Sequence, residues 1–446
     1  MTGSMTVWAG MQLGALVLVL CAVVRLLWWW SLTPTERRAV GLGRRVRRRW
    51  GALAENLGLC YEDRSSEVGH REEGRVICRP RIRVRWDPYG VVAAVATLPG
   101  VGIEEYRKHA RFIADAWGCH AVRVTRLHPG VVRLRGLLVD PLSEPYVMRP
   151  DGAAVDLAGL HVGRDEWGEE ATISLTDVSG ITIGGLPGYG KTSLVGHWFA
   201  QLAPSAAVQF AILDGKGGAD YADLGDRCFL RVDDEMEEAR GALRGLYDLM
   251  RARQQAIRSV RGTANVWRDG PSEDWPLVVV IVDESHTYVQ TGRKQFKEAA
   301  EENGWHLEQL VKKGRSVAML TILVTQKQTA DAIPTAVRDV CQFSLSYACK
   351  TDDAAVAALG ADIRNHAEVS PVRLVGREHV GVAVASLPGR PGFTRIRTPF
   401  VDEEHVAELA RRTAALRRDP AHLLTGCTGS SSTLRVLTVG GDEGSA

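Results

Sequence analysis

The segment GGLPGYGKTSLV, residues 184–195, carries the strongest chemical pattern in this 446-residue chain. Gly185, Gly190, Lys191 and Thr192 fit the spacing G-x-x-x-x-G-K-[ST], in which glycines let backbone N–H groups wrap phosphates. At such a site the lysine reaches the β- and γ-phosphates, and the threonine hydroxyl binds Mg²⁺. We therefore predict that the nucleotide-binding residues are Gly185, Leu186, Pro187, Gly188, Tyr189, Gly190, Lys191, Thr192 and Ser193.

A pair of carboxylates follows an apolar run in WPLVVVIVDESHTYV, residues 275–289. The run from Leu277 to Val282 is rich in β-branched residues, which is typical of a strand covered on both faces. Asp283 can then hold Mg²⁺, and Glu284 can polarise the water that attacks a γ-phosphate. The alternative is a purely structural buried strand that is followed by two acidic residues. Taken with the glycine-rich loop, the pattern predicts an ATPase that uses ATP and Mg²⁺, with Glu284 catalytic and with Thr192 and Asp283 at the metal.

Two further apolar runs are expected to lie in the same sheet. AVQFAILDGKGG has its apolar part end at Asp214, and VAMLTILVTQ ends at Thr325 and Gln326. Polar residues at the carboxyl ends of parallel strands lie beside the ligand in α/β sheets. We predict that Gln326 is a catalytic sensor of the γ-phosphate, with a simple turn residue as the alternative.

The order of these segments resembles that of the FtsK/SpoIIIE-type DNA translocases over about residues 155–390. ILDGKGGADYADL resembles their Asp-Pro-Lys-Gly segment, with Gly215 in place of the usual proline, and LEQLVKKGRSVAMLTILVTQ resembles their Gly-Arg-Ala segment and sensor strand, with Ser316 in place of alanine. The combination of Gly314-Arg315 with Thr325-Gln326 is more specific for this family than the glycine-rich loop, which many other nucleotide-binding proteins share. The resemblance implies a RecA-like motor, assembled as a homo-hexamer, that pumps double-stranded DNA through its pore.

The resemblance leaves two possible roles for each of two basic residues. Arg315, counted among the catalytic candidates, is either an arginine finger acting on a neighbouring subunit or a structural salt-bridge residue. Lys216 faces either the nucleotide side of the sheet or the pore.

The amino terminus has the pattern of a membrane anchor. Val7 to Val24 contains no charge, the three tryptophans 28–30 follow, and seven arginines between 37 and 49 are opposed only by Glu36. About 18–25 apolar residues can span a bilayer, and basic residues after the span keep the remainder in the cytoplasm. A cleaved signal peptide, whose charge order would be reversed, and a buried helix are the alternatives. We expect a single-pass protein of the cell membrane, whose arginine run contacts anionic lipid or DNA.

The expected fold class is α/β: a RecA-like P-loop motor with a mainly parallel sheet, preceded by a small α+β domain and one transmembrane helix. The boundaries are a transmembrane anchor at 1–32, a basic juxtamembrane segment and linker at 33–81, a small α+β domain at 82–150 with the order ββαββ, the motor at 151–399, and a helix with a disordered tail at 400–446. The small domain shows no catalytic constellation.

Composition excludes several other classes of protein. The chain is 45% apolar and 24% charged with a net charge of +2, which is ordinary for a globular protein and names no partner. Its eight cysteines form no CxxC pair, so we expect reduced thiols and no zinc site. No Asn-Lys-x-Asp motif supports a GTP switch. Thr192 and Asp283 are 283 − 192 = 91 positions apart, which leaves no room for the large helical insertion usual in coupling proteins that escort single strands.

The layout most resembles the compact conjugative Tra translocases of actinomycete plasmids and integrative elements. This resemblance implies double-stranded DNA, membrane lipid and accessory transfer proteins as partners. A chromosome-segregation DNA pump and a type VII-like protein secretion ATPase are the alternatives.

Overall fold

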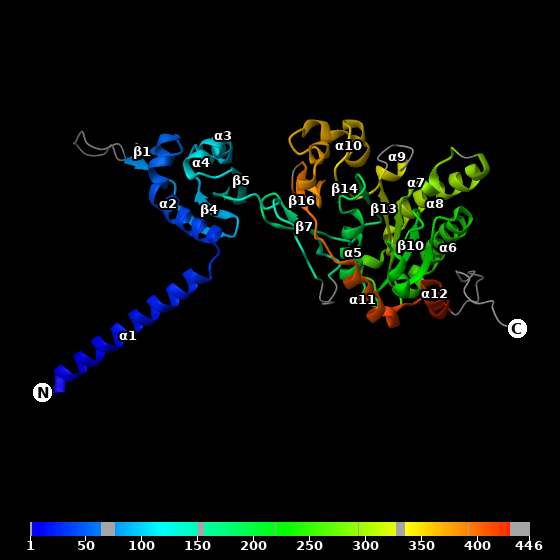
Figure 1. Cartoon of the computed structure of the whole chain (residues 1–446), viewed down its shortest axis with the longest axis horizontal. Helices are drawn as coiled ribbons and strands as arrows, with labels where there is room; N and C mark the ends of the chain where they lie inside the picture. The colour runs from blue at the N-terminus through cyan, green and yellow to red at the C-terminus, as the bar shows by residue number, and fades with distance from the viewer. Residues whose placement is uncertain are drawn as a thin grey trace. The chain divides into compact units, whose positions relative to one another are not determined.

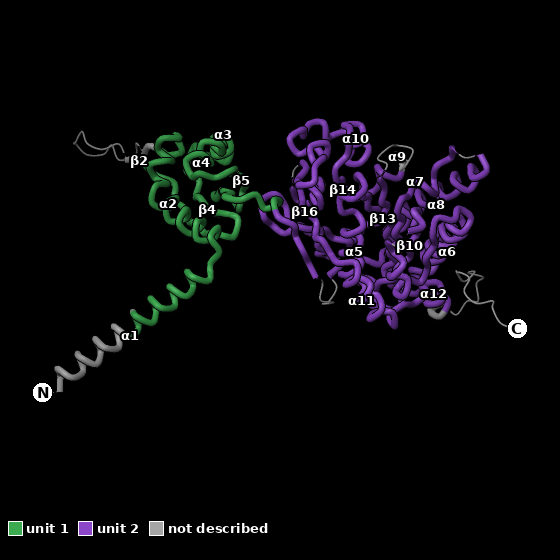
Figure 2. Tube along the Cα trace, viewed as in Figure 1, with its two compact units in different colours: residues 1–143 green, residues 144–446 purple. Residues whose placement is uncertain are grey.

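The computed structural model describes residues 2–63, 76–149, 156–218, 220–292, 294–326, 335–390 and 392–428. The chain forms two compact units, residues 1–143 (unit 1) and 144–446 (unit 2), which are coloured separately in Figure 2. Each unit has its own apolar core.

Unit 2 is built on a ten-stranded sheet with the order β11-β10-β12-β13-β9-β14-β15-β16-β7-β8 (Figure 1). The six strands from β11 to β14 run parallel, and the other four continue the sheet antiparallel. The expected α/β class with a mainly parallel sheet is confirmed. The strands are β7 (Leu160–Asp165), β8 (Glu170–Ile173), β9 (Gly180–Gly184), β10 (Val208–Asp214), β11 (Cys228–Val232), β12 (Leu277–Asp283), β13 (Met319–Thr325), β14 (Phe343–Ser346), β15 (Val382–Ala385) and β16 (Thr394–Arg397).

The central strands are covered on both faces, as their continuous apolar sequences predict. Every residue of β9, β10, β12 and β13 is buried. The helices of this unit are α5 (Lys191–Leu202), α6 (Met236–Arg261), α7 (His286–Val289), α8 (Lys297–Lys313), α9 (Thr335–Arg338), α10 (Asp352–Leu359), α11 (Glu403–Thr413) and α12 (Pro420–Thr428). Since α11 packs on α5 and α12 on α6, the segment after residue 399 is part of unit 2, and the expected boundary at residue 399 is wrong. The tail predicted to be disordered begins at Thr425, but residues 425–428 form the end of α12, so this part of the prediction is wrong; residues 429–446 lie outside the described residues.

The register of the parallel strands decides where polar groups meet. Asp214 at the end of β10 lies opposite Asp283 at the end of β12. Thr325 at the end of β13 lies opposite Gly184 at the end of β9. The carboxyl ends of these strands therefore form one edge, where α/β sheets bind their ligands.

Unit 1 contains a four-stranded antiparallel sheet with the order β3-β4-β6-β5. Its strands are β3 (Ile82–Asp87), β4 (Gly90–Ala96), β5 (Ala121–His128) and β6 (Val131–Leu137). Where one helix was expected there are two, α3 (Ile103–Lys108) and α4 (Ala110–Trp117), and a separate pair of strands is formed by β1 (Tyr61–Asp63) and β2 (Val76–Cys78).

The segment expected to be a basic linker is in large part a helix of this domain, α2 (Pro34–Asn56). Thr33 and Glu36 cap its first turn reciprocally. Its apolar stripe, which includes Val46 and Trp50, is buried in the core of unit 1, and the Trp50 indole donates a hydrogen bond of 2.9 Å to the Pro80 carbonyl. The expected boundary at residue 81 is therefore wrong, because the arginine run has an apolar face at helical spacing.

The helix α1 (Thr2–Ser31) contains the segment expected to cross a membrane. No helix in the described part of the chain is long and apolar enough to span a bilayer. The side chains of residues 2–15 and 18, which include most of the expected span, lie outside the described residues.

Candidate active site

The glycine-rich loop connects β9 to α5 and is pinned at its base. Gly185 has a φ of +144°, and a Cβ built there would lie 2.5 Å from the Tyr347 Cβ, so only glycine fits. The Leu186 N–H donates to the Ala348 carbonyl at 2.8 Å, and the Tyr347 hydroxyl donates to the Gly190 carbonyl at 3.1 Å. The segment after β14 therefore fixes the shape of the loop.

A second set of contacts holds the middle of the loop through Tyr189. Gly381 N–H donates to its carbonyl and Gly376 N–H to its hydroxyl, both at 3.0 Å. Pro187 and Gly188, at the tip, are exposed. The sequence alone does not predict the role of the residues after β14 and around Gly381, because they lie far along the chain from the loop that they contact.

Lys191 begins α5 and is buried, with 5% of its surface exposed. Its ammonium donates to the carbonyls of Gly185 at 2.7 Å and Leu186 at 2.9 Å. Burial lowers the pKa of Lys191 to about 8, and the nearby carboxylates of Asp283 and Glu284 oppose this shift. The cation is therefore held by loop carbonyls that offer no negative charge, and we expect a phosphate to be a stronger partner.

The two hydroxyls after Lys191 differ in their surroundings. Ser193 Oγ donates to the Pro399 carbonyl and accepts from the Val401 N–H, both at 3.1 Å. This side chain links α5 to the carboxyl-terminal segment, so only the backbone of Ser193 stays available for the predicted nucleotide contact. Thr192 stays half-buried at the start of α5, where the helix dipole favours an anion.

Asp283 and Glu284 are buried at the end of β12, as predicted. Lys216 Nζ lies 3.2 Å from Asp283 Oδ2 and 3.1 Å from Asp220 Oδ2. Burial alone would lower the pKa of Lys216, but the charges and hydrogen bonds of Asp283 and Asp220 outweigh it, so the pKa is raised. Lys216 thus lies beside Asp283 at the predicted nucleotide edge of the sheet, while the alternative role at a pore stays untested.

The glycine that replaces the family's proline has a structural reason in this chain. Gly215 N–H donates to the Asp283 carbonyl at 3.0 Å, a bond that proline cannot make. A Cβ at this position would lie 2.8 Å from the Glu284 carbonyl and 2.9 Å from the Asp283 carbonyl. The two carboxylates therefore depend on close backbone contact with Gly215.

Glu284 has a left-handed backbone, with a φ of +49°, which is rare for residues other than glycine. The Gln326 N–H donates to Glu284 Oε1 at 3.3 Å, and His286 Nδ1 lies 2.5 Å from the same oxygen. Strained residues of this kind cluster at functional sites. The Gln326 backbone thus lies beside Glu284, and its role as a sensor of the γ-phosphate stays a prediction. His286 was not predicted, although it follows Glu284 by only two residues.

Two buried carboxylate oxygens at this edge have no hydrogen-bond partner among the described residues, Asp214 Oδ2 and Glu284 Oε2, whereas Asp283 Oδ2 lies 3.2 Å from the Lys216 ammonium. Such oxygens suit a cation or an ordered water. In the described part of the chain no group of three or more His, Cys, Asp or Glu side chains could hold a metal ion. Mg²⁺ is usually held by one or two carboxylates together with the phosphates of its substrate, and Asp283 with Thr192 stays the predicted pair here.

Arg315 is not brought to this site. It is exposed just before β13, whose residues from Met319 to Thr325 separate it from the carboxyl edge. Its backbone carbonyl accepts a hydrogen bond of 2.8 Å from the Trp267 indole. Arg315 cannot serve the site of its own chain without rearrangement, so a role at a neighbouring subunit stays a prediction.

Comparison with known families identifies the amino-terminal part of the chain. Residues 20–138 match the family described as actinomycete conjugal transfer protein N-terminal domain. No curated protein matches the chain. The predicted resemblance to the conjugative Tra proteins of actinomycetes is thereby confirmed.

Comparison with solved structures shows the fold. The conjugation coupling protein TcpA of pCW3, in a monomer form with ATPγS, is similar with a TM-score of 0.51 and 12% identity, over 85% of this chain and 99% of that one. The cytoplasmic domain of the Thermomonospora curvata type VII secretion ATPase EccC follows with a TM-score of 0.47 and 17% identity, over 64% of this chain and 34% of that one. ATPases 2 and 3 of EssC from Geobacillus thermodenitrificans give 0.47 and 16%, over 61% and 51%.

Replacing Lys191 with alanine should remove ATP hydrolysis and weaken ATP binding about 10- to 100-fold, since a charged hydrogen bond contributes about 1.5–3 kcal/mol. Binding of a fluorescent ATP analogue and phosphate release measure the two effects. Lys297→Ala, which removes an exposed lysine from α8, is the matched control and should change neither. Normal hydrolysis in Lys191→Ala would contradict the assignment of the loop.

Glu284→Gln keeps the shape of the side chain but removes the base, so it should bind ATP normally and hydrolyse it about 10²–10⁴-fold more slowly. Single-turnover hydrolysis, measured beside equilibrium ATP binding, separates the two effects. The exposed Glu298 provides the control variant Glu298→Gln. Equal turnover in Glu284→Gln and the unaltered chain would show that another group activates the water.

Proposed function

We propose that the chain is an ATP-driven motor that moves double-stranded DNA during conjugative transfer. The observation that carries the proposal is that one chain combines a conjugal-transfer amino-terminal domain, residues 20–138, with a site in which Lys191, Asp283 and Glu284 meet at one sheet edge. The family match favours transfer between cells over the alternatives of chromosome segregation and protein secretion.

In this proposal each site residue has one task. The loop from Gly185 to Gly190 wraps the phosphates, and Lys191 neutralises their charge. Thr192 and Asp283 would hold Mg²⁺, whose charge would help to neutralise the phosphates. Glu284 takes a proton from the attacking water, and its strained backbone fixes the direction of its carboxylate.

Gln326 provides a path from the nucleotide to the remainder of the motor. Its N–H contacts the Glu284 carboxylate, and it directly follows strand β13. Loss of the γ-phosphate alters the charge beside Glu284, and Gln326 passes this change into the segment that follows the strand. A ring of six subunits, in which Arg315 reaches the site of a neighbour, would couple such changes around a central duplex.

The proposal includes attachment to a membrane through α1. The second half of this helix exposes large apolar side chains, among them Leu20, Val24 and Leu27, and Trp30 is 73% exposed. Surfaces of this kind are costly in water and mark contact with a membrane or a partner. Exposed arginines on α2, including Arg44 and Arg48, would lie against anionic headgroups.

Removal of residues 1–32 should release the chain from membranes while basal ATP hydrolysis continues, because neither core contains a residue before Leu42. Flotation with anionic vesicles at low and high salt measures attachment, since contacts by arginine alone weaken with salt. If the shortened chain still floats with vesicles at high salt, the anchor lies elsewhere.

Linear duplex DNA of almost any sequence should raise the ATPase rate of the full chain in detergent, because a duplex motor reads backbone charge and not base edges. Single strands should raise it less, and the effect should weaken steeply between about 50 and 200 mM salt. Glu284→Gln serves as the inactive control. Stronger stimulation by single strands would favour a coupling protein of the escorting kind, and stimulation by a peptide alone would favour secretion.

A further inference from the structure

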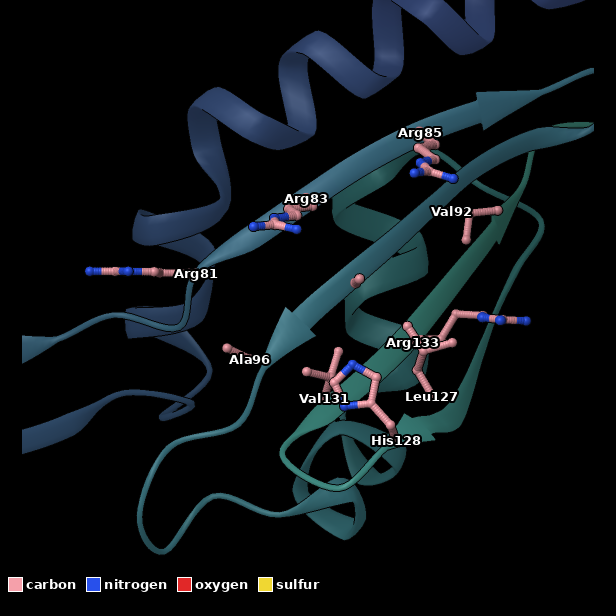
Figure 3. A pocket seen from close by; sticks show the side chains of 10 residues that line it. Arg81, Arg83, Arg85, Val92, Ala96, Leu127, His128, Val131 and Arg133 are labelled. Carbon is pink, nitrogen blue, oxygen red and sulfur yellow. The ribbon is translucent and has the colours of Figure 1, made fainter.

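The sheet of unit 1 has one covered and one open face. Strand alternation places Val84, Ala93 and Leu134 in the core with the helices. The opposite face carries Arg83, Arg85 and their cross-strand neighbours (Figure 3). In Figure 3 the helices lie behind the strands, and the labelled side chains stand on the near face.

This open face forms a hollow of about 600 Å³ whose floor is small and apolar and whose sides are basic. Val92 and Ala94 of β4 form the floor. Arg81, Arg83 and Arg85 stand along one side, and Arg133 stands on β6 beyond the floor. We call this hollow the arginine groove.

The charge of the arginine groove is not cancelled locally on its β3 side. Within the described residues, no ion pair joins Arg81, Arg83 or Arg85 to a carboxylate, whereas Arg135 on the same face is paired with Asp87 at 2.7 Å. Unit 1 as a whole has 22 Lys and Arg against 12 Asp and Glu, a net charge of +10. Unit 2 has 33 against 41, a net charge of −8, so the positive charge of this chain is concentrated in unit 1.

The form of the groove favours a rod-shaped polyanion. Alternate residues of an antiparallel strand lie about 7 Å apart, so the three arginines of one side present a row of planar forks suited to successive phosphates. A hollow accepts a convex rod better than a flat bilayer. Among its lining residues there is no phenylalanine, tyrosine or tryptophan on which unpaired bases could stack, which disfavours a single strand.

We infer that the arginine groove is a second DNA-binding site, which holds the phosphate backbone of duplex DNA outside the motor unit. This inference rests on the proposed function, since it takes duplex DNA as the substrate. The groove would bind duplexes without regard to sequence and retain the substrate while the motor changes nucleotide state.

The test uses the full chain in detergent and the triple variant Arg81→Ala/Arg83→Ala/Arg85→Ala. The control Arg44→Ala/Arg45→Ala/Arg48→Ala removes three exposed arginines from α2, the same charge from the same unit. Affinity for a fluorescent 30-base-pair duplex is measured by anisotropy over a range of salt, beside binding to anionic vesicles. Circular dichroism and ATPase activity without DNA show whether each variant is folded.

The groove variant should lose about 10- to 100-fold in duplex affinity at 100 mM salt, and its salt dependence should fall by up to about 2.7 in slope, about 0.9 for each phosphate contact. Its vesicle binding and basal ATPase activity should be unchanged, and the α2 control should keep its duplex affinity. Unchanged affinity and slope in the groove variant would overturn the inference, as would loss of vesicle binding without loss of duplex binding.

The same experiment separates this inference from the proposed function. If duplex DNA stimulates the ATPase of the unaltered chain and the groove variant binds duplex equally well, the inference fails and the motor function stands. If the groove variant loses duplex affinity although duplex never stimulates the unaltered chain, the groove stands and the motor function fails.

Discussion

Opposite charges buried at one edge of a parallel sheet are the constraint on which the rest of the structure depends. Asp283 and Glu284 lie under the ends of the central strands, with Lys216 and Lys191 as their nearby cations. Buried charges are costly unless they are compensated, so each needs the others in place. The covered strands, the hydrogen bonds that fix the loop and the close approach of Gly215 all hold this cluster in position. In the proposed function, ATP with Mg²⁺ would add both a polyanion and a cation to this cluster and so change its net charge.

The sequence alone predicted most of unit 2, because its loop and its central strands can be recognised from short segments. The spacing of the residues from Gly185 to Thr192 identifies the phosphate-binding loop. The strands that end at Asp214, Asp283 and Thr325 are recognised by their apolar sequences, which are typical of strands covered on both faces. Parallel strands end at a common edge, so the meeting of Glu284 with Gln326 could be expected before any coordinates. The resemblance to conjugative Tra proteins, predicted from the layout of the chain, agrees with the family match of residues 20–138.

What local sequence could not provide is long-range pairing. The contact of Lys216 with Asp283 follows from the register of β10 against β12, and the support of the loop by Tyr347 comes from 157 residues further along the chain. Because of its arginine run, the segment before residue 50 was predicted to be a linker. It forms the amphipathic helix α2, whose Trp50 is buried in unit 1. Arg315 was a catalytic candidate from motif alone, and the strand direction puts it at the far edge of the sheet. The arginine groove could not be predicted without the order of the strands in the sheet, because alternation within a strand does not show which strands are neighbours.

The claim that hydrolysis at this edge drives movement along duplex DNA is tested most directly by displacement of a third strand from a DNA triplex. The full chain should release the third strand only when ATP is present and hydrolysed, at a rate that grows with ATP concentration and is lost in Glu284→Gln. Release that needs no ATP, or that Glu284→Gln supports as well as the unaltered chain, would contradict the account.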